Sequence, residues 1–167
     1  LSEEVIRRLI LWSKTSPDSK SLEALFNTGA RRIRREKTEQ WLGLIGDWLS
    51  DNSTAQKILG IQALAPAARE QEFENLPVVF QLIHPVMDDP PGSLQPALIE
   101  LLQILAKRTP QETLYFLKHH LILNNKVGTL RVVRRLIPSF EPDQQTQLKL
   151  FLTDQFKTAE EKPPGIT

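Results

Sequence analysis

The segment that most constrains the fold is residues 94–107, "LQPALIELLQILAK", which is apolar on almost every side of a helix. Its large apolar residues are Leu98, Ile99, Leu101, Leu102, Ile104 and Leu105. A helix of this kind must be covered on several sides, so we expect it in the middle of the protein. We expect Ser93 to cap this helix and Pro96 to lie in its first turn, where a backbone N–H would have no intrahelical partner.

Helical periodicity also marks most of the remaining chain. In five further segments the apolar residues have the spacing of one helix face. These segments are 36–50, 53–68, 76–87, 110–122 and 143–157. No segment alternates apolar and polar residues over the length of a strand with turn signals at both ends. The sequence therefore predicts an all-α protein of about eight or nine helices.

Two helix starts and the tryptophans carry further local signals. At the start of 110–122, Thr109 can cap the helix, Pro110 suits its first position, and Glu112 completes a capping box. We expect Thr38 to cap the helix in 36–50. We expect all three tryptophans, Trp12, Trp41 and Trp48, to be buried.

The helices run in pairs joined by short polar links, which suggests an internal repeat. A shift of roughly 40 residues lays the apolar pattern of 53–64 on that of 93–104. This period favours HEAT-like or armadillo-type repeats stacked into an α-solenoid, and a plain helical bundle is the alternative. We expect one helical-repeat domain over residues 1–158 and a flexible C-terminal tail over 159–167.

Composition excludes several functional classes. A hydrophobic content of 40% and a charged content of 25% are ordinary for a globular protein, and the net charge is only +1. The chain has no cysteine, which excludes disulfides and thiolate metal sites and fits a reducing cytoplasm. No apolar run approaches the roughly 18 residues that span a bilayer, so we expect no membrane partner. Because the chain begins with Leu1 and not with methionine, the possibility of a longer parent protein stays open.

One family resembles part of this sequence. "NSTAQKILGIQAL" and "GSLQPALIELLQILAKRTPQETLYFLKHHL", within residues 50–138, are similar to the HEAT-like alkylpurine DNA glycosylases of the AlkD family, which act in DNA alkylation repair. The resemblance implies a HEAT-like fold.

The family's functional residues are not matched. Thr54 and Gln56-Lys57 stand where the family has tryptophan and paired arginines, and Gln95-Pro96 and Glu100 stand where it has arginine-lysine and tryptophan. The resemblance implies a catalytic carboxylate on an early helix, and the one residue that we match to it, Glu23, has no aromatic-aspartate arrangement beside it. A glycosylase that stacks a damaged base needs an aromatic platform and a nearby carboxylate, so the comparison argues against that activity.

The residues also predict no catalytic site, cofactor or metal. His119 and His120 are adjacent on a helix and point about 100° apart, so they cannot chelate one ion together. His84 is the only other histidine, and no metal-binding, nucleophile-elbow or Gly-rich phosphate motif is present. We expect His120 to lie partly against the core and His119 to face water.

Two basic segments are the best candidates for a binding surface. "RRIRREK", residues 31–37, places four arginines and Lys37 around Glu36. "KVGTLRVVRR", residues 126–135, has arginines at i, i+3 and i+4, opposite an expected buried stripe of Val127, Leu130, Val133 and Ile137. In a HEAT-type stack the second helix of each pair lines the concave surface, and we expect residues 126–137 to form such a helix. The candidate phosphate-binding residues are Arg31, Arg34, Arg35, Lys57, Lys126, Arg131, Arg134 and Arg135.

Three functional hypotheses follow. The first is a non-catalytic scaffold that presents a concave surface to a protein partner, with the cations as solvated faces balanced by nearby acids. The second is a DNA-binding relative of the repair glycosylases that contacts duplex phosphates through these cations. An active glycosylase is the third.

Overall fold

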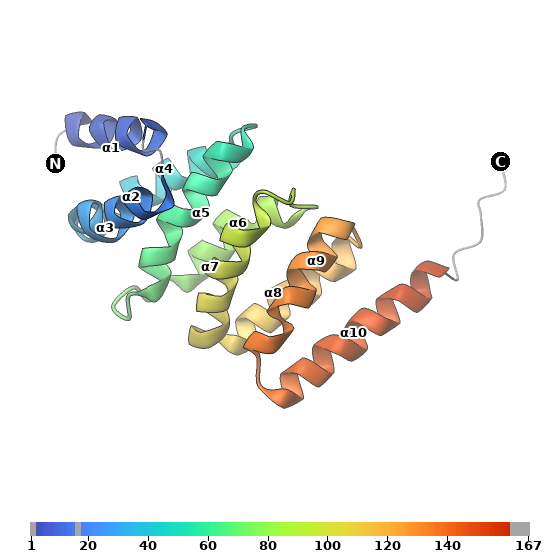
Figure 1. Ribbon diagram of the computed structural model, residues 1–167. Coiled ribbons are helices and arrows are strands. Elements are labelled where there is room, and N and C mark those ends of the chain that lie inside the picture. Colours follow the sequence, from blue (N-terminus) through green and yellow to red (C-terminus); the bar gives the residue numbers. More distant parts are fainter. Residues whose placement is uncertain (1–2, 16–17, 161–167) are drawn as a thin grey trace. The chain divides into compact units, whose positions relative to one another are not determined.

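The computed structural model describes residues 3–15 and 18–160, whose regular secondary structure is all helical and includes no strand. Contacts divide the chain into two compact units, unit 1 (Leu1–Pro85) and unit 2 (Val86–Thr167) (Figure 1). The helices of unit 1 are α1 (Glu3–Thr15), α2 (Ser19–Ala24), α3 (Arg31–Glu36), α4 (Thr38–Ser50), α5 (Thr54–Arg69) and α6 (Leu76–Ile83). Those of unit 2 are α7 (Gln95–Arg108), α8 (Pro110–Leu123), α9 (Val127–Leu136) and α10 (Pro142–Glu160). The all-α prediction is confirmed.

The ten α-helices of the described residues exceed the eight or nine that we expected. The difference includes α2 and α3, which have six residues each and are joined by the π-helical turn η1 (Leu25–Gly29). Six residues are fewer than two turns, too short for an apolar period to show. Two 3-10 turns, η2 (His84–Met87) and η3 (Ile137–Ser139), follow α6 and α9.

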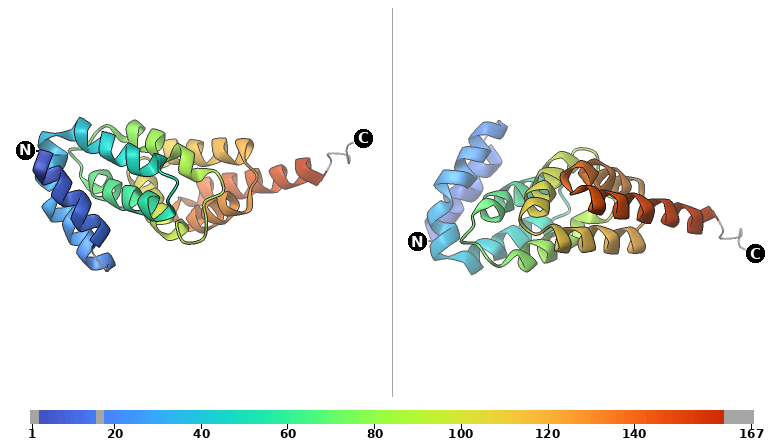
Figure 2. Two further views of the ribbon diagram at one scale, coloured as in Figure 1. Left: turned by 90° about the horizontal axis from the view of Figure 1, so that it is seen from above. Right: turned by 90° about the horizontal axis from the view of Figure 1, so that it is seen from below.

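Unit 1 is built around an aromatic core. Phe26, Trp41 and Trp48 are buried, with ring centroids 6.1 to 6.4 Å apart. Helices α4 and α5 lie side by side (Figure 2). A Cβ added at Gly60 of α5 would lie 2.8 Å from Leu49 Cγ of α4, so the close approach of the two helices requires glycine. The expectation that Trp41 and Trp48 are core residues is confirmed.

Unit 2 is built around α7, as its apolar surface predicts. Leu98, Leu101, Leu102 and Leu105 are fully buried. Helix α7 packs against α8 and α9, and α8 also packs against α10 (Figure 1). Helix α8 buries Leu114, Leu117 and Leu121 together with Thr113, Phe116 and His120, which confirms the face expected for this helix.

The start of α9 is tied to the segment that precedes α7. The Thr129 hydroxyl donates to the Met87 carbonyl at 2.7 Å and accepts from the Asp89 N–H at 3.1 Å. Asp89 has a φ of 55°, a left-handed conformation that aspartate tolerates, and its carboxylate accepts from the Gly128 N–H at 2.8 Å. The N-termini of α7 and α9 therefore lie at the same end of unit 2, and the two helices run parallel.

Several local expectations were wrong. The N-cap of α7 is Leu94 and not Ser93, because the Leu94 and Gln95 N–H groups bond to the Pro91 carbonyl in a preceding turn. Thr38 is the first residue of α4, and its hydroxyl donates back to the Arg34 carbonyl.

The capping box before α8 was half right. Thr109 is the N-cap and Pro110 the first residue of α8, but the Thr109 hydroxyl donates to the Glu112 carboxylate and caps no backbone N–H. One bond between the two side chains has replaced the reciprocal pattern.

Two apolar residues expected in the core are exposed. Trp12 is 54% exposed on α1, and Val127 is 62% exposed at the start of α9. Helix α10 extends to Glu160, and the rest of the expected C-terminal tail lies outside the described residues. None of the described helices combines the length and the apolar character needed to cross a bilayer.

Candidate functional site

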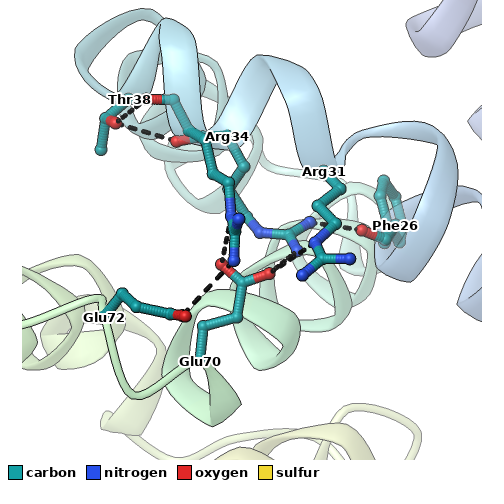
Figure 3. A network of polar contacts seen from close by, with 7 residues as sticks. Phe26, Arg31, Arg34, Thr38, Glu70 and Glu72 are labelled. Carbon is teal, nitrogen blue, oxygen red and sulfur yellow. Dashed lines mark hydrogen bonds and ion pairs between the residues drawn. The ribbon is translucent and has the colours of Figure 1, made fainter.

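The first basic segment forms an ion-pair network that we call the Glu70 cluster, made of Arg31, Arg34, Arg35, Glu70 and Glu72 (Figure 3). Arg34 is 3% exposed and lies in the middle of this cluster. Its guanidinium donates to the Phe26 carbonyl at 2.5 Å and to the Glu70 carboxylate at 2.5 Å. Glu70 directly follows α5, so these bonds fix α3 and η1 against the end of α5.

The other arginines of this segment also face acids. Arg31 and Arg35 approach the Glu70 carboxylate at 3.9 Å, and Arg35 also approaches Glu72 at 3.4 Å. Arg32 pairs with Glu36 one turn along α3, at 2.8 Å. An open hollow of about 270 Å³ beside the cluster is lined by both signs of charge, from Arg34, Arg35, Thr38, Glu70, Glu72 and Phe73. The segment is therefore largely neutralised within unit 1, and Arg34 is buried away from any solvent-borne partner.

The second basic segment has a different environment. Arg131, Arg134 and Arg135 are exposed on α9, and we call them the α9 arginine face. Residues 124–140, which include all of α9, contain no aspartate or glutamate. Positive charge on this helix is thus not balanced along its own length. Arg134 and Arg135 also lie in the last turn, as Lys107 and Arg108 do on the parallel α7, where cations complement the helix dipole.

The two lysines that we predicted as phosphate-binding residues, Lys126 and Lys57, do not belong to the α9 arginine face. Lys126 donates to the Asp88 carboxylate at 2.8 Å, and this hydrogen bond, together with the attraction between the charges, raises the pKa of Lys126. Its role is to hold the start of α9 against the segment before α7. Lys57 is half-buried near the start of α5 in unit 1.

Sequence reasoning missed a group of exposed apolar residues at the turn between α8 and α9, which we call the α8–α9 corner: Ile122, Leu123 and Val127. They are 63%, 55% and 62% exposed. Val127 shares its face with the arginines, since Val127, Arg131, Arg134 and Arg135 are spaced i, i+4, i+7 and i+8 and all four are exposed. That spacing was readable in the sequence. Val127 also fits the spacing of a buried stripe, so spacing alone does not place it at the surface.

Helix α8 has an exposed stripe of its own. Tyr115 is 73% exposed and stacks on the exposed His119 ring, with centroids 6.3 Å apart, and Ile122 follows one turn later. The expectation that His119 faces water is confirmed. His120 is 1% exposed and meets the Phe116 ring at 4.5 Å, so it is more deeply buried than expected.

Among the side chains that the structure describes, no group of three or more histidines, aspartates or glutamates is arranged to hold a metal ion. Comparison of the chain with known protein families, with curated proteins and with solved structures found no match.

Proposed function

We propose that this protein is a non-catalytic, HEAT-like binding module whose partner is another protein. The observation that carries this proposal is the α8–α9 corner, where three large apolar side chains are exposed beside the α9 arginine face. Exposed apolar groups rimmed by polar residues mark interaction surfaces, because a partner that covers them removes apolar area from water.

The solenoid arrangement is part of the same proposal and is supported by the packing inside unit 2. Helix α7 packs against α8 and against the parallel α9, and α8 packs against α10. In stacked helix pairs, each helix likewise packs against its own partner and against the parallel helix of the next pair.

A selection from a random peptide display library tests the protein-binding proposal. The target is the whole protein, and the matched competitor is a variant with Ile122→Ser, Leu123→Ser and Val127→Ser, all at exposed positions. We expect peptides that bind the parent protein and not the variant. Enrichment of the same peptides on both proteins, or of none, would contradict a binding role for the corner.

Duplex DNA is the second candidate partner, and the α9 arginine face favours it, because adjacent exposed arginines can contact phosphates without reading sequence. Fluorescence anisotropy with a labelled duplex should then show binding at low salt that weakens steeply as salt rises. A variant with Arg131→Ala, Arg134→Ala and Arg135→Ala should bind more weakly and with a smaller salt dependence. Lys149→Ala, at an exposed position of α10, is the control. Absence of binding by the parent protein at low salt would exclude this candidate.

A further inference from the structure

We propose that the α8–α9 corner and the α9 arginine face together bind an acidic amphipathic helix of a partner protein. This inference rests on the proposed protein-binding function and names the chemistry of the partner segment.

The apolar part of this surface is compact. Leu123 ends α8 and Val127 begins α9, and the four intervening Cα steps limit the separation of the two residues to about 14 Å. Ile122 adjoins Leu123, and all three side chains are more than half exposed. An apolar side chain of a partner can therefore cover part of this group in one contact.

The cationic part continues from the apolar part along the same helix face. Arg131 is one turn beyond Val127, about 6 Å along the axis, and Arg135 is two turns beyond, about 12 Å. No described carboxylate pairs with Arg131 or Arg135, and the two acids that contact the start of α9, Asp88 and Asp89, are already bonded to Lys126 and to the Gly128 N–H. The two arginines can donate hydrogen bonds to carboxylates of another chain.

Charge complementarity and spacing together define the partner. A helix laid along α9 would need an apolar residue over the corner and carboxylates about one and two turns away, at positions four and eight residues from the apolar one. A nucleic acid could use the arginines but has no apolar side chain to cover Ile122, Leu123 and Val127. The observations therefore favour an acidic amphipathic peptide over a polyanion.

Helix α9 is held firmly enough to present this spacing. Thr129 and Gly128, on its buried side, are bonded to Met87 and Asp89, and Lys126 pairs with Asp88. Because these bonds leave the exposed face untouched, substitutions at Val127, Arg131 and Arg135 should not unfold unit 2.

The test uses fluorescein-labelled 18-residue helical peptides and anisotropy with the whole protein. The probe carries two leucines followed by glutamates four and eight residues later, and the controls are a scrambled peptide and one with lysines in place of the glutamates. We expect the probe to bind at least tenfold more tightly than both controls. The variant with Arg131→Ala and Arg135→Ala should weaken probe binding about 5- to 10-fold, and Lys149→Ala should leave it unchanged.

A charge exchange separates this inference from general stickiness. The variant with Arg131→Glu and Arg135→Glu should lose the acidic probe and gain the lysine peptide, while Leu123→Ser with Val127→Ser should weaken both. Equal binding of acidic and basic probes, or no effect of the arginine changes, would overturn the inference.

The peptide selection distinguishes this failure from failure of the proposed function. Selected peptides that depend on the corner but carry no acids would leave the binding function standing and refute the acidic helix. If labelled duplex binds through the same arginines, the acidic probe does not bind, and the selection yields no corner-dependent peptide, the partner is a nucleic acid and both proposals fall.

Discussion

Replacing Glu70 by glutamine should destabilise unit 1 more than its partly exposed position suggests. The substitution keeps the shape and an acceptor oxygen but removes the charge that faces Arg34. The Arg34 side chain is only 2% exposed, so water cannot take over the role of the carboxylate. The effect of the substitution is the cost of a buried guanidinium without a counter-ion.

The structure sets the size of this effect. Breaking a fully buried ion pair costs about 3–5 kcal/mol, and the 20% exposure of the Glu70 side chain admits some water. Arg31 and Arg35, at 3.9 Å, lose weaker and largely screened attractions of about 0.2–1 kcal/mol each. We therefore expect Glu70→Gln to lower the free energy of unfolding by about 3 kcal/mol.

Glu36→Gln is the matched control. Glu36 pairs with Arg32 at 2.8 Å, but both side chains are about half exposed or more, and an exposed pair of this spacing contributes about 0.3–0.5 kcal/mol. The same chemical change, made at a carboxylate that pairs with a different arginine of α3, should thus have roughly one-sixth of the effect.

Tryptophan fluorescence in urea reports on this unit, because all three tryptophans lie in unit 1 and Trp41 and Trp48 are buried near Phe26. With a slope of about 2 kcal/mol per molar urea, the midpoint should fall by about 1.5 M for Glu70→Gln and by less than about 0.3 M for Glu36→Gln. Equal shifts for the two variants would refute the argument that burial of Arg34 sets the energy.

A double variant checks the mechanism. Arg34→Met combined with Glu70→Leu removes both charges, and an apolar replacement of a buried pair is often tolerated. We expect partial recovery, since the Phe26 carbonyl also loses its bond from Arg34. A double variant less stable than Glu70→Gln alone would show that the bond to Phe26 outweighs the ion pair.

Three further predictions concern packing and local bonds. Gly60→Ala should destabilise unit 1 by about 1–3 kcal/mol in urea unfolding because its Cβ has no room, whereas Gly43→Ala, in open space within α4, should stabilise the unit by about 0.5–1 kcal/mol; equal shifts would contradict this. Thr129→Val should lower the stability of unit 2, followed by circular dichroism, by about 1–3 kcal/mol because the buried Met87 carbonyl and the part-buried Asp89 N–H lose their partner; an unchanged midpoint would contradict it. The hydrogen bond from Thr109 lowers the pKa of Glu112, so its stabilisation is present above the ordinary carboxyl pKa and is lost as pH falls through the folded value. In an NMR titration Thr109→Val should raise that pKa toward the ordinary value, and an unchanged pKa would exclude this bond as the cause.

Local sequence was sufficient to predict the class of the fold and much of its core. The apolar surface of 94–107 requires neighbours on several sides, and α7 has α8 and α9 as neighbours. Trp41 and Trp48 share the apolar face of one helix and are buried together. These features depend on residues three or four positions apart, a relation that a sequence displays directly.

Tertiary structure alone decided which cations remain available at a surface. Arg34 and Arg131 look equivalent in sequence, yet Arg34 is buried against Glu70, 36 residues away, while Arg131 is exposed on a helix without acids. Val127 likewise fits either face of α9 by spacing, and only the packing against α7 and α8 selected the exposed one. Burial and charge pairing are set by residues distant along the chain, so local periodicity could place these side chains on a helix but could not decide what each one faces.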